Sequence, residues 1–272
     1  MHSWSIPVLV LLASIVLLYL RGWRRLHMAF PGVWLPWRPA AFVAGMLLWL
    51  AASGSPLALL DHHYLTAHMV QHLLLMTVAA PLILLGGPVI TLLHGLPAGI
   101  AGLFHRRAAH CLASVLTHPV FCWLASTAVV IGWHIPAVFQ SGMRSGAGHA
   151  VEQLCFLAGG ILFWWPVIQP WPAVAKWPLW SIPLYLFLAA LPCDALSAFL
   201  CLCNRVVYPY YLLAPHSSLV AALNDQDCAG ALMWVWVTFA YLFPAAGLTF
   251  RLLSPEKRFV EKPVAGGNNR RG

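Results

Sequence analysis

The feature that most constrains this chain is a series of apolar runs, each about 20 residues long and separated by short loops. A helix needs about this many apolar residues to cross the hydrocarbon core of a bilayer. Hydrophobic residues make up 61% of the 272 residues and charged residues only 8%, far below the roughly 25% of a soluble domain. The sequence therefore predicts a polytopic membrane protein without a separate soluble domain.

The apolar runs predict about seven membrane-spanning helices. We expect an all-α, polytopic transmembrane helix bundle over residues 1–254 and a disordered cytoplasmic tail over residues 255–272, which has no apolar run to bury. The motif Ser53-Gly54-Ser55-Pro56 interrupts the second span, which a helix bundle tolerates. The predicted spans are roughly 4–20, 40–60, 64–86, 119–139, 149–168, 178–200 and 227–250.

The basic residues predict the orientation of the bundle. With these spans, 13 of the 15 Lys and Arg residues fall on one side, and only Arg144 and Arg205 fall on the other. Because basic loops stay in the cytoplasm, we expect the N-terminus outside and the C-terminus in the cytoplasm. The net charge of +8 then reflects membrane topology and does not indicate a nucleic-acid partner.

Two histidines in the third apolar run are four residues apart, so His68 and His72 lie on one helix face, about one turn from each other. The predicted orientation brings His134 and His149, from the next two spans, to the same outer level. A single histidine at that depth is more often a hydrogen-bonded core residue. Ionisable groups inside a membrane tend to be functional and to face the bundle interior. Four histidines at one level therefore predict ligation of a metal or a haem by some of this set.

Three polar residues on other spans are predicted to orient these imidazoles. Asp225 and Gln226 precede the seventh span, and Asp194 lies in the outer half of the sixth. A ligating imidazole usually donates its second N–H to a carboxylate or carbonyl oxygen, which these side chains provide. The structural alternative is that Asn224 or Asp225 caps the first turn of the seventh span.

The softness of the donors bears on which metal such a site would hold. Imidazole suits copper, zinc and iron, whereas thioether and thiolate ligands favour Cu(I). Met69, Met76 and Met233 are candidate soft donors, although methionines also serve to fill cores. The pair Cys201-Leu202-Cys203 could bind Cu(I), cycle between thiols and a disulfide, or be two unrelated interfacial cysteines.

Several short motifs occur in a fixed order between residues 60 and 250. They are His68-Met-Val-Gln-His72-Leu-Leu-Leu-Met76, Pro81-Leu-Ile-Leu-Leu-Gly86-Gly-Pro88, Trp133-His134-Ile-Pro136, His149, Asp225-Gln226 with Ala229-Gly230, and Met233-Trp234. In this combination the chain resembles the polytopic CtaG-type cytochrome c oxidase assembly factors. The resemblance implies a seven-span protein of the bacterial inner membrane that helps to mature a copper-containing terminal oxidase. It carries over to His68, His72, His134, His149, Asp225 and Gln226, and it does not include Cys201 or Cys203.

From the residues and the resemblance together we expect a non-enzymatic copper-handling assembly factor. The copper, favoured as Cu(I), would be held by His68 and His72 with His134 or His149. The expected partners are an apo cytochrome c oxidase subunit, a periplasmic copper chaperone and the lipid bilayer. No nucleophile with a convincing base partner occurs in the sequence, so no enzyme activity is expected.

Two other functions fit parts of the sequence. In a membrane b-type cytochrome, histidines from two spans would ligate haem axially, although two histidines on one span better serve a small ion. A copper or proton transporter would need interior polar groups that continue to the cytoplasmic side. The inner half of the predicted bundle has few such groups, which counts against transport.

Overall fold

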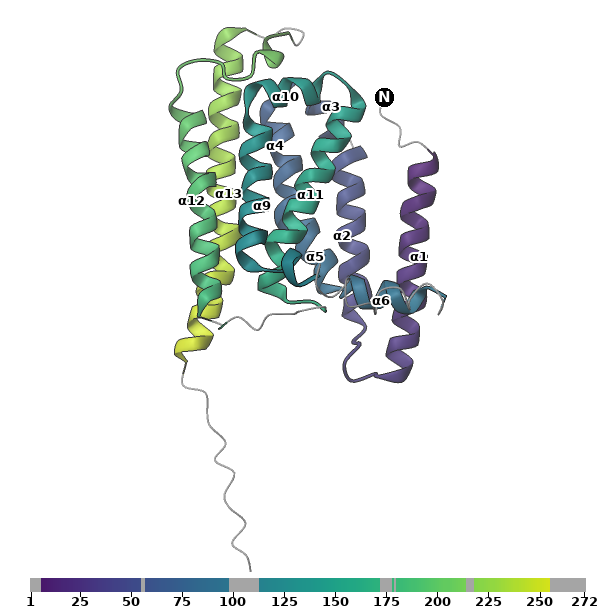
Figure 1. Cartoon of the computed structure of the whole chain (residues 1–272). Helices are drawn as coiled ribbons and strands as arrows, with labels where there is room; N and C mark the ends of the chain where they lie inside the picture. The colour runs from purple at the N-terminus through teal and green to yellow at the C-terminus, as the bar shows by residue number, and fades with distance from the viewer. Residues whose placement is uncertain are drawn as a thin grey trace, which may run out of the picture.

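A computed structural model describes residues 6–54, 57–97, 113–171, 178, 180–213 and 218–254. The structure is 85% helix, and the described residues contain no strand, which confirms the all-α fold class. Figure 1 shows the long helices running side by side in one bundle. The predicted tail, residues 255–272, lies outside the described residues.

Most of the predicted spans correspond to helices with similar bounds. The third span consists of two α-helices joined through a five-residue π-helical turn, η1. The helices are α1 (Ile6–Ala29), α2 (Trp37–Gly54), α3 (Leu57–Leu60), α4 (Leu65–Leu74), η1 (Leu75–Ala79), α5 (Ala80–Leu85), α6 (Pro88–Gly95), α9 (Pro119–His134), α10 (Pro136–Met143), α11 (Gly146–Ile168), α12 (Ser181–Leu202), the 3-10 helix η3 (Pro209–Leu213) and α13 (Leu219–Leu253).

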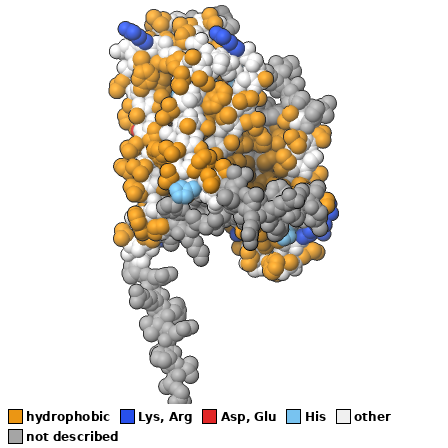
Figure 2. Space-filling view, viewed as in Figure 1, with side chains coloured by type: hydrophobic (Ala, Val, Ile, Leu, Met, Phe, Trp, Pro, Cys, Tyr) orange, Lys and Arg blue, Asp and Glu red, His pale blue; other side chains and the backbone are white. Residues whose placement is uncertain are grey.

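The helices are those of a membrane protein. Among the described residues, four helices are long and apolar enough to cross a membrane, or five if a bent pair counts as one span. Figure 2 shows hydrophobic side chains over most of the visible face, with Lys and Arg side chains near its two ends. The count of seven spans and the orientation stay predictions. The qualifying helices are Leu65–Leu85, α11, α12, α13 and the pair α9 and α10.

The helix from Leu65 to Leu85 is the centre of the bundle. In the 18-residue stretch that represents this helix as a span, 67% is buried, whereas the corresponding share for α13 is 17%. It packs against α2, α11 and α13, so little of it is left to face lipid. Polar side chains on this helix are therefore enclosed by protein on several sides.

The fourth predicted span, 119–139, is not one straight helix. The helix α9 ends at His134, and α10 begins at Pro136 after a bend of 76°. Proline has no N–H for the helix and disfavours a helical conformation in the residue before it, here Ile135. The bend places His134 at the end of α9 and turns α10 across the end of the bundle (Figure 1).

The seventh span begins earlier than predicted. The helix α13 starts at Leu219, and Ser218 caps it by accepting a hydrogen bond from the backbone N–H of Ala221 at 3.1 Å. The prediction that Asn224 or Asp225 caps this helix is therefore wrong. The five residues from 219 to 223 are mostly apolar and extend the helix upstream, so the polar stretch 224–227 lies within it.

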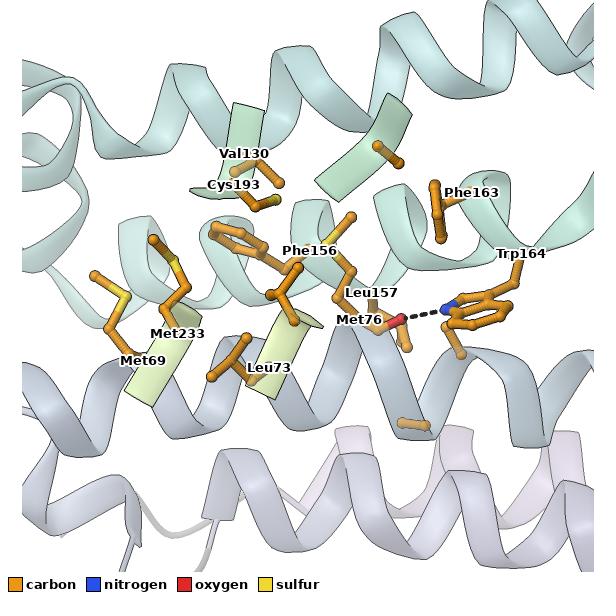
Figure 3. Packing of buried hydrophobic residues seen from close by; sticks show 14 of the residues in the cluster. Met69, Leu73, Met76, Val130, Phe156, Leu157, Phe163, Trp164, Cys193 and Met233 are labelled. Atoms are coloured by element: carbon orange, nitrogen blue, oxygen red, sulfur yellow. Dashed lines mark hydrogen bonds between the residues drawn. The ribbon is translucent and has the colours of Figure 1, made fainter. Parts of the chain in front are cut away.

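The helix α11 approaches the central helix closely at Gly160. A Cβ atom at this position would lie 2.7 Å from the carbonyl oxygen of Met76 and 2.8 Å from its Cα. Beside this contact the indole of Trp164 donates a hydrogen bond to the same carbonyl at 3.0 Å (Figure 3). The two backbones thus touch at the π-helical turn, which requires glycine at position 160.

We expect Gly160→Ala to destabilise the protein by about 1–3 kcal/mol, because the added methyl group overpacks this contact. The matched control is Gly159→Ala, whose Cβ would meet only Val129, at 3.5 Å or more. Thermal unfolding of the two purified variants in detergent measures the difference. Equal unfolding temperatures for the two variants would contradict the assignment of the helix contact to Gly160.

Candidate metal centre

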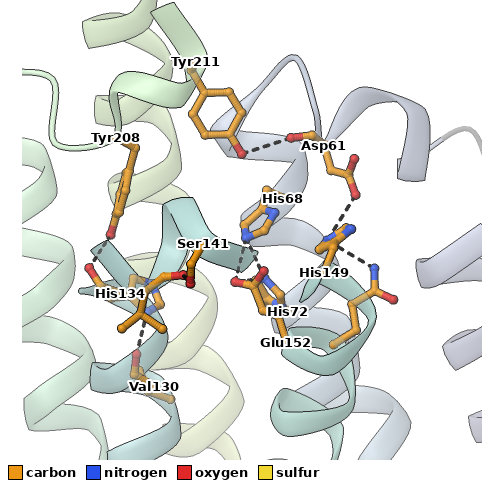
Figure 4. A network of polar contacts seen from close by, with 12 residues as sticks. Asp61, His68, His72, Val130, His134, Ser141, His149, Glu152, Tyr208 and Tyr211 are labelled. Atoms are coloured by element: carbon orange, nitrogen blue, oxygen red, sulfur yellow. Dashed lines mark hydrogen bonds and ion pairs between the residues drawn. The ribbon is translucent and has the colours of Figure 1, made fainter. Parts of the chain in front are cut away.

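All Asp, Glu, His, Lys and Arg side chains that are buried in the described part of the chain gather in one region of the bundle (Figure 4). Buried ionisable groups in a membrane are costly unless they pair with one another or serve a site. Their convergence from α4, α9, α11 and the turn before α4 therefore marks this region as the candidate functional site. The six residues are Asp61, His68, His72, His134, His149 and Glu152.

Three of these residues form a tight group. The Nε2 atoms of His68 and His72 lie 2.7 Å apart, and Oε1 of Glu152 lies 3.2 Å and 3.4 Å from them, respectively. Ligands of a tetrahedral ion with bonds of about 2.0–2.1 Å are separated by roughly 3.3 Å. The two distances to Glu152 match those around a small metal ion, whereas the two imidazoles are hydrogen-bonded to each other and would have to separate slightly to bind one. All three side chains are buried.

A second group shares His68 with the first. It consists of Asp61, His68 and His149, whose potential ligand atoms lie within 4.8 Å of one another. Nε2 of His149 is 3.5 Å from Oδ2 of Asp61, and the amide nitrogen of Gln153 donates to the same Nε2 at 3.4 Å. Burial raises the pKa of the Asp61 carboxyl, which neighbouring His62 opposes. A cation at this position would favour the ionised carboxylate.

Several polar atoms of both groups lack a hydrogen-bond partner among the described residues. They include both carboxylate oxygens of Asp61, Oε2 of Glu152 and the Nδ1 atoms of His68 and His72. An unsatisfied polar atom in an apolar interior costs about 1–3 kcal/mol, and more when it is charged. The donor set of imidazoles and carboxylates therefore fits a cation, whose binding would offset the cost of the buried carboxylates.

The structure brings together three of the four predicted histidine ligands. His68, His72 and His149 belong to the two groups, whereas His134 belongs to neither. Nδ1 of His134 donates to the carbonyl oxygen of Val130 at 2.7 Å. The ring of Phe156 stacks on His72 at a centroid distance of 3.9 Å and meets His134 edge-on at 6.3 Å. His134 therefore lies beside the metal centre but outside both groups.

The two carboxylates of the groups were not predicted as ligands from the sequence. Glu152 follows His149 by three residues, and this spacing places both side chains on one helix face, as the spacing of His68 and His72 does on α4. That signal was available in the sequence. Asp61 lies in a turn, where no periodicity indicates the direction of a side chain.

Asp225 contacts the start of α4 and not an imidazole. Its carboxylate accepts from the backbone N–H groups of Leu65, at 2.6 Å, and Thr66, at 3.2 Å, and from the hydroxyl of Thr66, at 2.6 Å. Tyr64, the N-cap residue of α4, provides no side-chain cap. Asp225 thus supplies from another helix the negative charge that the positive end of α4 favours. It holds the helix that carries His68 and His72.

Gln226 holds the connection between α12 and α13. Its Oε1 accepts from the backbone N–H of Val207 at 2.8 Å, and its amide nitrogen donates to the carbonyl oxygens of Leu200 and Arg205, both at 3.2 Å. This connection carries Tyr208 and Tyr211, which donate to the backbone carbonyls of His134 and Asp61, both at 3.0 Å. Through it, Gln226 supports the site without touching an imidazole.

The remaining predicted residues lie away from the two groups. Asp194 is partly buried on α12, and its Oδ1 has no hydrogen-bond partner among the described residues. The thiol of Cys201 donates to the backbone carbonyl of Asp227 at 3.5 Å, and both Cys201 and Cys203 are free thiols. These contacts give Cys201 a packing role against α13.

Comparison with known proteins identifies the family. A family model described as cytochrome c oxidase caa3 assembly factor (Caa3_CtaG) matches residues 17–254. The chain belongs to this family. Both groups of candidate ligands, and the residues that position them, lie within the matched region.

Two curated relatives are similar over most of the chain. They are the uncharacterized proteins Mb0105 of Mycobacterium bovis and MT0111 of Mycobacterium tuberculosis, each 25% identical over 242 residues. The alignment covers 84% of this chain but only 36% of each relative, so the chain spans about a third of their length. No solved structure matches the chain.

We expect Asp225→Ala to destabilise the protein by about 1–2 kcal/mol, since it removes the cap of α4. Asp225→Asn retains an acceptor oxygen and should lose less. The control is Asp227→Ala, an exposed side chain two residues along the same helix. Thermal unfolding in detergent compares the three variants. If Asp225→Ala unfolds at the wild-type temperature, the capping role is wrong.

Proposed function

We propose that this caa3 assembly factor is a non-enzymatic copper carrier of the bacterial inner membrane. It would hold copper in the histidine–carboxylate centre and deliver it to an apo cytochrome c oxidase subunit at the outer surface. Membership of the assembly-factor family supports the oxidase as client. The observation that carries the metal part is the convergence of the six buried Asp, Glu and His side chains in one region.

The ligand chemistry of the centre suits copper. Imidazole is a good ligand for copper, and a carboxylate adds affinity for its harder, divalent form. Glu152 and Asp61 together would neutralise the double charge of Cu(II), which lowers the cost of burying that ion. The softer Cu(I), favoured by the methionines in the sequence, requires other donors than these two carboxylates.

The shared position of His68 supports a transfer by ligand exchange. An ion held by Asp61, His68 and His149 can move to His68, His72 and Glu152 without leaving His68. Only coordination bonds form and break in such a step, so no catalytic group is needed. A periplasmic copper chaperone would load the ion at the Asp61 end, which lies before the first turn of α4.

The geometry supports the b-type cytochrome and the transporter less well than it supports a copper carrier. The Nε2 atoms of His68 and His72 are 2.7 Å apart on one helix, whereas axial haem ligands approach from opposite faces of the macrocycle. For transport, an ion would have to continue along the central helix. From Leu73 to Leu85, the described residues bury Thr77 as their only polar side chain, and its hydroxyl already donates to the carbonyl of Leu73.

We expect His72→Ala to lower copper affinity at least tenfold, because even residues that only support a ligand contribute about 10–100-fold. Glu152→Gln keeps the shape but removes the charge, and should weaken Cu(II) more than Cu(I). The control is His94→Ala, an exposed histidine on α6. Copper per chain, measured by mass spectrometry after dialysis against a chelator, gives the binding result.

The same variants test the proposal in cells that depend on the protein for oxidase assembly. Cytochrome c oxidase activity should fall with His72→Ala and Glu152→Gln and stay at the wild-type level with His94→Ala. Normal copper content and normal oxidase activity in the His72→Ala strain would overturn the proposal. A Soret band in the purified protein would instead support the haem alternative.

A further inference from the structure

A cavity lined by soft donors adjoins the metal centre. Its volume is about 30 Å³, and its wall is contributed by α4, η1, α9, α11, α12 and α13. Figure 3 shows the sulfur-bearing side chains of Met69, Met76, Cys193 and Met233 near the ring of Phe156. The donors that line the cavity are Met69, Met76, Met233, Cys193, His72 and His134, and all of them are buried.

The tautomer of His134, a residue of the cavity wall, leaves one ring nitrogen with a free lone pair. Its Nδ1 lies 2.7 Å from the carbonyl oxygen of Val130, and a carbonyl can only accept, so Nδ1 carries the proton. Nε2 then keeps its lone pair, and it is buried without a hydrogen-bond partner among the described residues. A metal-ligating histidine has this arrangement, with one nitrogen donating to a carbonyl and the other free to bind.

Neither core filling nor a bound water accounts well for this cavity. Methionine is adaptable and normally fills gaps, whereas a void large enough for an ion remains between these side chains. A buried water needs two to four polar partners. The hydroxyl of Thr77 already donates to Leu73 and accepts from the indole of Trp236 at 2.8 Å, and the surface that faces the void is apolar.

We propose that this cavity is a second metal site, which takes a soft monovalent cation, Cu(I). Nε2 of His134 and the sulfur atoms of Met69 and Met233 would bind it, because imidazole and thioether ligands together favour Cu(I). His72 lines both this cavity and the histidine–carboxylate centre, so the two positions adjoin. The inference rests on the proposed function for the identity of the cargo but uses a different set of ligands.

The test uses the purified full chain in detergent, loaded with Cu(I) alone under a reductant and without oxygen. Copper K-edge X-ray absorption and copper per chain are measured together. The wild type should show sulfur scatterers and bind one copper ion more than the double variant Met69→Leu/Met233→Leu. Leucine conserves the volume of methionine, so this variant should fold. The control is Met46→Leu, a buried methionine of α2 that does not line the cavity.

The outcomes separate the two proposals. Loss of the sulfur shell in the double variant but not in Met46→Leu supports the second site. A wild-type spectrum without sulfur scatterers overturns it, whether or not any variant folds, and so does a sulfur shell that persists in the double variant. Glu152→Gln should keep the sulfur shell. If that variant also binds as much Cu(II) as the wild type when both are loaded without reductant, the histidine–carboxylate centre fails while the soft site stands.

Discussion

The contact between Glu152 and the two histidines of α4 is the interaction on which the rest of the structure depends. Glu152 is 1% exposed, and a carboxylate so deeply buried is stable only beside groups that offset its charge. His68 and His72 supply this only if α11 lies close against α4. Gly160 lies about two turns after Glu152 on α11. It permits that approach because it places no side chain between the two backbones. Helix packing and the chemistry of the site therefore impose one shared requirement on the sequence.

The long helix α13 acts on this arrangement from outside. Asp225 fixes the start of α4, and Gln226 fixes the connection whose tyrosines hold the Asp61 turn and the end of α9. Neither side chain touches a candidate ligand, yet each holds an element that carries one. Two adjacent residues on one helix can do this because successive side chains point about 100° apart, toward two different neighbours.

Much of the fold follows from local sequence, and much of the site does not. Apolar runs of sufficient length predicted the helices, and the spacing of His68 and His72 predicted their shared face. The comparison of depths correctly brought His149 to them. It did not separate His134, which belongs to neither group, because depth along a span does not tell where a side chain points. The contact of Asp225 with Leu65 joins residues 160 positions apart, which no local pattern reveals.

The donors along the central helix change from hard to soft. Asp61 precedes the helix, His68 and His72 follow on its first two turns, and Met69 and Met76 line the cavity beside and beyond them. The cost of burying an ion rises with its charge and with its distance from water. Carboxylates at the end of the bundle can neutralise a divalent ion, whereas thioethers carry no charge and stabilise only an ion whose own charge is small. An ion in the methionine-lined cavity therefore has to be monovalent or to bring an anion with it. The thioether donors of this cavity suit a monovalent ion.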